Sequence, residues 1–166
     1  LLALYVAGWP AAAICDGPMR FALEKIGTLW RHGPAGIVIE QRATDTCVRV
    51  LAERRTLLTP PVVGASAALG AAPNGDPYIL PSMMAAAVLA DLGYRDHNLG
   101  PEVPMSALGQ AADRYRPRIV WLAMSVSRDA DGLAAAVVEL AGRLARRGAT
   151  LIVADPLMNT FPLPRQ

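Results

Sequence analysis

The sequence predicts a small helical bundle followed by an open, doubly wound parallel α/β sheet. Of its 166 residues, 53% are hydrophobic and 18% charged, which is enough apolar material to bury a core and excludes a disordered chain. Up to Thr59 the apolar residues recur at helical spacing, whereas after Pro60 and Pro61 short apolar strands alternate with helices. We therefore expect a helical bundle cap over 1–59 and a sheet domain over 60–166.

Two long helices dominate the first part. Asp16 is a suitable N-cap for a helix that ends at His32, since Gly and Pro follow it in the first turn. The second helix runs over about 36–58. Together with shorter helical pieces at 1–6 and 10–15, these helices predict a four-helix-bundle-like cap.

The second part has the pattern of four strands separated by three helices. We expect a first strand that opens at 62–65, further strands at 94–99, 118–125 and 150–154, and helices at 81–92, 104–115 and 130–147. This alternation predicts a Rossmann-like or flavodoxin-like sheet with helices on both faces. Ligands of such sheets bind beyond the carboxyl ends of the strands, so we expect a site among the segments 70–78, 99–102, 125–128 and 155–156.

Composition and motifs exclude several function classes. Sixteen Lys and Arg against fourteen Asp and Glu give a charge of +2, and the basic residues are scattered, which argues against nucleic acid as the direct ligand. Cys15 and Cys47 lack the spacing of a zinc site or a disulfide framework, so we expect no metal and a cytoplasmic location. The apolar segment 1–7 is too short to cross a membrane.

No serine has the setting of a hydrolase nucleophile, so we expect a binding module and not an enzyme. The loop 71–81 has the open backbone of a segment that approaches a ligand closely, although a rigid connection is the plain alternative. It lacks the glycine patterns of dinucleotide and phosphate loops, which argues against a nucleotide. Because there is no initiator Met, we expect this chain to be a fragment of a longer protein.

The loops of the sheet domain resemble the cobalamin-binding modules of methyltransferases and mutases and, most closely, of the light-sensing repressors that use adenosylcobalamin. The first loop of that family reads Asp/Glu-x-His-x-x-Gly; here Asp76 keeps the acid, Tyr78 replaces the axial His and Pro81 replaces the Gly. Leu99-Gly100 matches the Leu-Gly signature on the next strand, and Ser125-Val-Ser127 matches the serine-containing third strand.

The helical part resembles the cap of the same repressors, in which nine residues separate a Trp from Glu-His. Here Trp30 is followed at that spacing by Glu40-Gln41, so the second histidine is also replaced. The resemblance implies a flavodoxin-like domain with a tetrapyrrole between cap and sheet. The residues expected to contact this cofactor are Trp30, Glu40, Gln41, Cys47, Gly75, Asp76, Tyr78, Leu99, Gly100, Ser125 and Ser127.

The resemblance further implies a sensory, photoreceptor-type domain of a transcriptional regulator, which forms homo-oligomers and contacts DNA only through a segment absent from this chain. Cobalamin is the first expected ligand. Because both histidines are replaced, biliverdin or haem in the same cleft is the alternative, with Cys47 as an attachment point for a bilin or simply a buried core thiol. A corrinoid carrier for methyl transfer, and a module that has lost its ligand, remain open.

Several of these residues also have plainer interpretations. Glu40 can be a solvated helix charge, Asp76 a turn residue and Trp30 part of a core. Tyr78 can place its ring against a flat macrocycle, although a phenol is a poorer cobalt ligand than imidazole. His97, near the end of the second expected strand, can reach a ligand carboxylate at the edge of the sheet or lie on the surface.

Overall fold

A computed structural model describes residues 1–126 and 130–154 of the chain. The chain divides into two units, a helical unit at Leu1–Pro60 and a sheet unit at Pro61–Gln166. The helical unit is followed by a four-stranded parallel sheet with helices, so the predicted fold class is confirmed. Among the described helices, none combines the length and the apolar character that a bilayer span requires.

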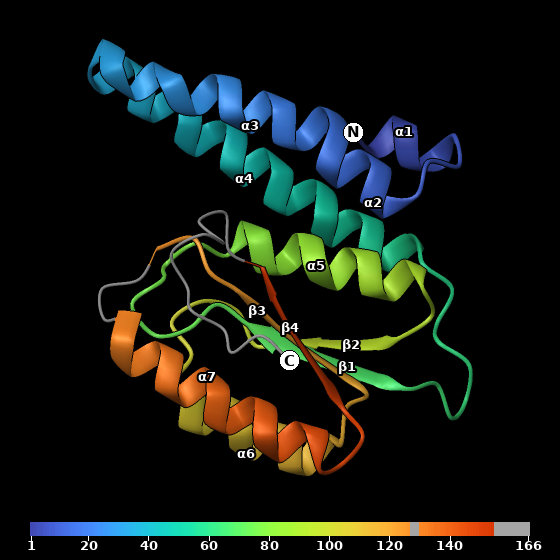
Figure 1. Cartoon of the computed structure of the whole chain (residues 1–166). Helices are drawn as coiled ribbons and strands as arrows, with labels where there is room; N and C mark the ends of the chain where they lie inside the picture. Colours follow the sequence, from blue (N-terminus) through green and yellow to red (C-terminus); the bar gives the residue numbers. More distant parts are fainter. Residues whose placement is uncertain (127–129, 155–166) are drawn as a thin grey trace. The chain divides into compact units, whose positions relative to one another are not determined.

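The helical unit consists of short N-terminal helices and one long helix (Figure 1). The predicted second helix is α4, which runs from Pro34 to Leu57. The helix start predicted at Asp16 falls at a kink, where the non-helical backbone of Gly17 (φ −93°, ψ −106°) separates two helical stretches and no side-chain cap forms. Proline within a helix removes a backbone donor and crowds the preceding turn, and the flexible Gly17 before Pro18 absorbs that distortion. The elements before α4 are α1 (Leu2–Val6), α2 (Ala11–Ile14), the π-helical turn η1 (Cys15–Met19), α3 (Arg20–Gly27) and the 3₁₀ turn η2 (Thr28–His32).

The start of α4 lies close to the preceding turn because residue 36 has no side chain. A Cβ atom at Gly36 would lie 1.9 Å from the carbonyl oxygen of Leu29. Further along α4, Cys47 and Leu51 are buried, and the guanidinium of Arg54 lies 4.6 Å from the centre of the Tyr5 ring. These contacts join α4 to the N-terminal helices through a small apolar core and a buried cation–π pair.

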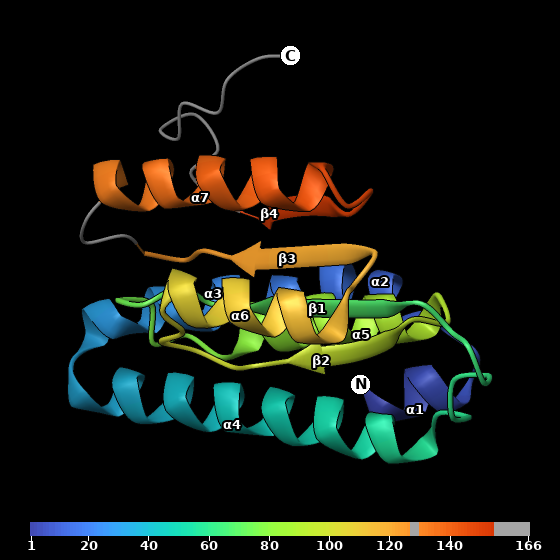
Figure 2. The ribbon, with the colours of Figure 1, turned by 90° about the horizontal axis from the view of Figure 1, so that it is seen from below.

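The sheet unit contains four parallel strands in the order β2-β1-β3-β4 (Figure 2). Helix α5 covers one face of the sheet, and α6 and α7 cover the other (Figure 1). In chain order the elements are β1 (Ala67–Ala71), α5 (Leu80–Asp91), β2 (Arg95–Asn98), α6 (Met105–Tyr115), β3 (Ile119–Ala123), α7 (Ala130–Ala145) and β4 (Thr150–Ala154).

The first strand lies later in the chain than predicted. The expected start of this strand at 62–65 is wrong, because Val62 and Val63 are exposed and outside the sheet. The strand that forms, β1, has the sequence Ala-Ala-Leu-Gly-Ala and is buried along its whole length. Valine favours strands only where its side chain can pack, and here the small residues of β1 permit close helix contact on both faces.

Alternating residues of β1 and β3 supply two cores. Leu69, Val120 and Leu122 point into the core shared with α6 and α7. Ala68 and Trp121 belong to the core under α5. The Trp121 ring occupies the space beside Gly70, where a Cβ atom would lie 2.0 Å from Cδ2 of the indole. The absence of a side chain at residue 70 therefore sets the position of the largest residue in the sheet unit's core.

We expect Gly70→Ala to lower the free energy of unfolding by about 1–3 kcal/mol, because the new methyl group must displace the packed indole of Trp121. Urea titration followed by far-ultraviolet circular dichroism measures this change. Gly142→Ala is the matched control, since its Cβ meets only the end of Arg146 at 3.7 Å and alanine favours the helix. Equal stability of the two variants would contradict the proposed packing.

Candidate functional site

A buried carboxylate lies at the carboxyl edge of the sheet, which we call the rim. Asp76, in the loop after β1, has no exposed surface. Its Oδ1 accepts a hydrogen bond from the backbone N–H of Tyr78 at 3.0 Å, and its Oδ2 accepts from the backbone N–H groups of Ser125 and, at 3.3 Å, Val126. Asp76 therefore joins the loop after β1 to the loop after the neighbouring strand β3.

The loop after β2 is joined to the same centre. The backbone N–H of Glu102 donates to the carbonyl of Asp76 at 3.2 Å, and its side-chain Oε2 accepts from the N–H of Gly75 at 2.7 Å. The N–H of Gly100 donates to Asn98 Oδ1 at 3.0 Å. Gly75 and Gly100 have φ values of +88° and +87°, which favour glycine over other residues. All three loops of the rim are thus fixed by polar contacts.

A second polar chain lies beneath these loops. Trp121 Nε1 donates to Ser82 Oγ at 3.0 Å, and Ser82 Oγ donates to Asn98 Oδ1 at 2.8 Å. Ser82 has no exposed surface, so its hydroxyl acts as donor and acceptor inside the fold. This chain connects β3, α5 and the end of β2. None of these three residues was predicted as a site residue, because their partners come from distant elements, whereas Glu102 lies in the predicted edge segment 99–102.

Each loop of the rim exposes large apolar side chains. Tyr78 is 50% exposed, and Ile79 beside it is also exposed. Leu99 and Val126 are exposed after β2 and β3. Around Gly75 and Gly100, a Cβ atom would meet no other atom within 4 Å, so open space lies beside the backbone. The rim therefore combines a fixed backbone with apolar contact surface, an arrangement suited to binding a large, partly apolar ligand.

Of the predicted site residues, Gly75, Asp76, Tyr78, Leu99, Gly100 and Ser125 lie on these loops. Ser127 lies outside the described residues, as do 128 and 155–156 of the predicted edge. His97 is not at the rim, because its ring stacks on Tyr115 of α6 with the centroids 4.4 Å apart. Among the residues that the structure describes, no group of His, Cys, Asp and Glu could hold a metal ion.

The remaining predicted site residues belong to the helical unit. Thr44 Oγ1 donates to Glu40 Oε1 at 3.2 Å, whereas Oε2 of Glu40 is buried and has no hydrogen-bond partner among the described atoms. Gln41 is exposed. The backbone of Trp30 is part of η2, and its side chain lies outside the description. A buried carboxylate oxygen without a donor is costly, which distinguishes Glu40 from a solvated helix charge.

Both thiols are buried in the helical unit. Burial raises the pKa of Cys15 to about 11, opposed by the nearby charge of Arg54. Burial also raises the pKa of Cys47 above its ordinary value. Because the thiolate is the nucleophile, these environments disfavour reaction at neutral pH. The position of Cys47 beside Leu51 in the core is that of a structural thiol.

Comparisons with solved structures give 34 similar chains, and two of them are the following. No protein-family model matches the chain, and no curated protein matches it. The chain is 16% identical to a cobalamin-binding protein from Desulfitobacterium hafniense (TM-score 0.48), covering 87% of this chain and 65% of that one. It is 15% identical to the methanol:cobalamin methyltransferase complex MtaBC from Methanosarcina barkeri (TM-score 0.44), covering 87% and 55%. The chain therefore spans less than two thirds of either solved chain.

We expect Asp76→Asn to lower the free energy of unfolding by about 1–3 kcal/mol, because an amide NH₂ would replace one of the two accepting oxygens. Hydrogen exchange should accelerate at the amides of Ser125 and Val126, or at that of Tyr78. Asp45→Asn removes the same charge from an exposed ion pair with Arg49 and should change stability by less than about 0.5 kcal/mol. Unchanged exchange at all three amides would show that Asp76 does not hold the loops.

We expect both cysteines to react slowly with iodoacetamide at pH 8 in the folded chain and rapidly in urea. For Cys15, a pKa of about 11 against the ordinary value of about 8.5 lowers the thiolate fraction by roughly two orders of magnitude. Cys15→Ser and Cys47→Ser variants isolate each thiol, and mass spectrometry measures the rate. Reaction of folded Cys47 at the rate of free cysteine would instead make it available for bilin attachment.

Proposed function

We propose that this chain is a ligand-binding module whose sheet unit binds a corrin of the cobalamin type at the rim. The observation that carries the proposal is the buried Asp76 carboxylate, which holds the loops after β1 and β3 through their backbone N–H groups. This residue occupies the acidic position of the family loop that the sequence resembles. The exposed Tyr78, two residues later, occupies the position of the axial ligand.

The chemistry of the rim fits the ring of such a ligand. A corrin is broad and flat, with amide groups at its periphery. The exposed side chains of Tyr78, Leu99 and Val126 offer apolar contact to its face. The backbone at Gly75 and Gly100 is open to close approach, and the hydroxyl of Tyr78 can hydrogen-bond to a peripheral amide.

The donor set does not fit axial ligation of cobalt by this chain. A phenol is a poor ligand beside an imidazole, and His97, the histidine nearest in sequence to the rim, stacks on Tyr115. When bound, a cobalamin supplies a cobalt–carbon bond that light can cleave or from which a methyl group can be transferred. In this proposal the residues of the rim hold the corrin ring, and Tyr78 contacts the ring without binding the cobalt.

We further propose that the biological role is sensory: a regulatory domain of the photoreceptor type in a transcriptional regulator, with homo-oligomerisation as the output. The resemblance of Trp30 and Glu40-Gln41 to the cap pattern of the repressors supports this role over that of a methyl carrier. In a sensor, the ligand shifts the equilibrium between two conformations of the protein. For this it needs only to bind one conformation more tightly than the other. The contributions of Trp30, Glu40, Gln41 and Cys47 stay predictions.

Titration of the purified chain with hydroxocobalamin, haemin and biliverdin, followed by visible absorption, tests the ligand. We expect binding of the cobalamin and a weakening on the order of tenfold in Tyr78→Ala, because the ring contact is lost. Tyr78→His should tighten binding and shift the cobalt spectrum. Phe21→His, on an exposed position of the helical unit, is the control for adding an imidazole elsewhere.

Three outcomes would contradict the proposal in different ways. A Soret band with haemin alone, or far-red bands with biliverdin alone, would replace the corrin by another tetrapyrrole. A colourless protein with all three would favour a role in protein association. If the cobalamin binds, size-exclusion chromatography in the dark and after illumination with adenosylcobalamin tests the sensory role, and an unchanged oligomeric state would favour a carrier.

A further inference from the structure

Arginines that are separated in sequence meet at the amino edge of the sheet, opposite the rim. The turn between α6 and β3 and the turn between α7 and β4 are neighbours, because Ile119 pairs with Thr150 and the N–H of Thr150 donates to the carbonyl of Arg118 at 2.9 Å. Six of the chain's sixteen basic residues lie on or beside these two turns: Arg114, Arg116, Arg118, Arg143, Arg146 and Arg147. Although scattered along the sequence, they form one basic region in the fold.

A cavity of about 380 Å³ opens between these turns. Its apolar walls include Ala112, Pro117 and Leu144, and its polar lining consists of Asp113, Arg116 and Arg147. This volume falls within the range of about 300–1,000 Å³ that is typical of small-molecule sites, and the mixture of apolar wall and a few charged groups is also typical of them.

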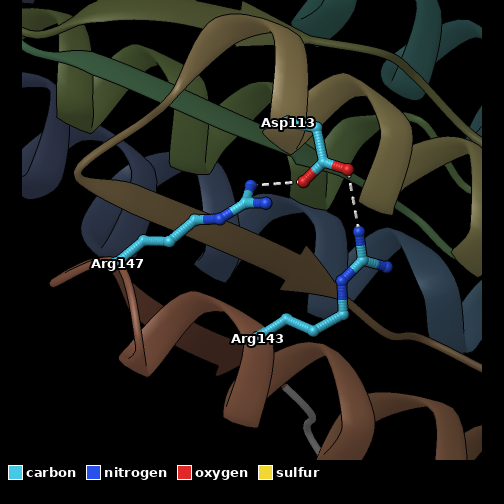
Figure 3. Close-up of polar contacts among 3 residues, drawn as sticks. All are labelled: Asp113, Arg143 and Arg147. Carbon is cyan, nitrogen blue, oxygen red and sulfur yellow. Dashed lines mark hydrogen bonds and ion pairs between the residues drawn. The ribbon is translucent and has the colours of Figure 1, made fainter.

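Asp113 holds two guanidinium groups at this cavity (Figure 3). Arg143 Nη2 donates to Asp113 Oδ2 at 2.9 Å, and Arg147 Nη1 donates to Oδ1. Arg143 can lie against α6 because residue 109 is glycine, where a Cβ atom would be 2.9 Å from Arg143 Nη1. One carboxylate thus orients Arg143, in the last turn of α7, and Arg147, in the turn that follows α7, and it neutralises only one of their two charges.

Arg116 adds a further positive charge. No carboxylate pairs with it in the described part of the chain. Arg116 directly follows the last turn of α6 and has a φ of +46°. This left-handed conformation is strained for any residue other than glycine. The three guanidinium groups and the single carboxylate leave a local charge of +2 at the mouth of an apolar cavity.

We propose that this cavity binds a small organic anion, a phosphate monoester or a carboxylate, whose oxyanion group is held by Arg116 and Arg147. The planar guanidinium fork suits the two oxygens of either group. The volume exceeds that of the oxyanion group alone, so the apolar walls accommodate a small organic body. This site is on the opposite edge of the sheet from the rim and does not depend on the corrin proposal.

Calorimetric titration of the full chain at low salt with inorganic phosphate, phenyl phosphate and citrate tests the site. We expect phenyl phosphate or citrate to bind more tightly than inorganic phosphate, and their order identifies phosphate or carboxylate chemistry. Arg116→Gln and Arg147→Gln should each weaken binding by about tenfold or more. Arg146→Gln is the matched control, because it removes the same charge from the same turn but does not line the cavity.

A nuclear magnetic resonance titration of the same chain should shift the backbone amides of residues 112–116 and 147–149, which surround the cavity. Absence of binding by all three anions would overturn the proposal. Equal weakening by Arg146→Gln and Arg147→Gln, together with tighter binding of a DNA duplex or polyglutamate, would show a diffuse basic surface for polyanions and would also overturn it. Circular dichroism of each variant checks that the fold is intact.

Discussion

The carboxylate of Asp76 is the interaction on which the rim depends. A buried carboxylate must be compensated, and within residues 1–126 and 130–154 the compensation comes from backbone N–H groups of two loops. Backbone N–H groups from two loops can all donate to one carboxylate only if each loop keeps a particular backbone conformation. A single side chain therefore determines the conformation of segments that come from two strands, and on these segments the side chains of Tyr78 and Val126 stay exposed.

The order of helices and strands could be predicted from the sequence because the spacing of apolar residues and the positions of Gly and Pro are local properties. Helix α4 and strand β4 lie within two residues of their expected bounds. The strand β1 was placed wrongly because its alanines carry no strand preference, whereas the two valines before it do. The helix boundary near Asp16 was predicted with a side-chain cap but is a kink at Gly17, since the same residue types serve in both settings. Tertiary packing decides such cases, and it is not visible in a single sequence.

The candidate site was predictable only where a motif marks it. Asp76, Leu99 and Gly100 follow from the resemblance of two loops, and the structure places them on neighbouring segments of the rim. The chain of Ser82, Asn98 and Trp121 could not be predicted, because each partner comes from a different element and none has a distinctive spacing. The arginines of the amino edge were hidden for the same reason: the register of β3 and β4 brings them together.

The position of Trp121 has an optical consequence. It is the sole tryptophan of the sheet unit, since the other two of the chain's three are Trp9 and Trp30 in the helical unit. An indole that is sealed from water yet donates to one hydroxyl emits at short wavelength, and its emission is sensitive to that bond. A ligand that is held near the carboxyl edge and absorbs in the near ultraviolet, where tryptophan emits, would accept this emission by resonance energy transfer. The chain thus carries its own fluorescent reporter beneath the loops.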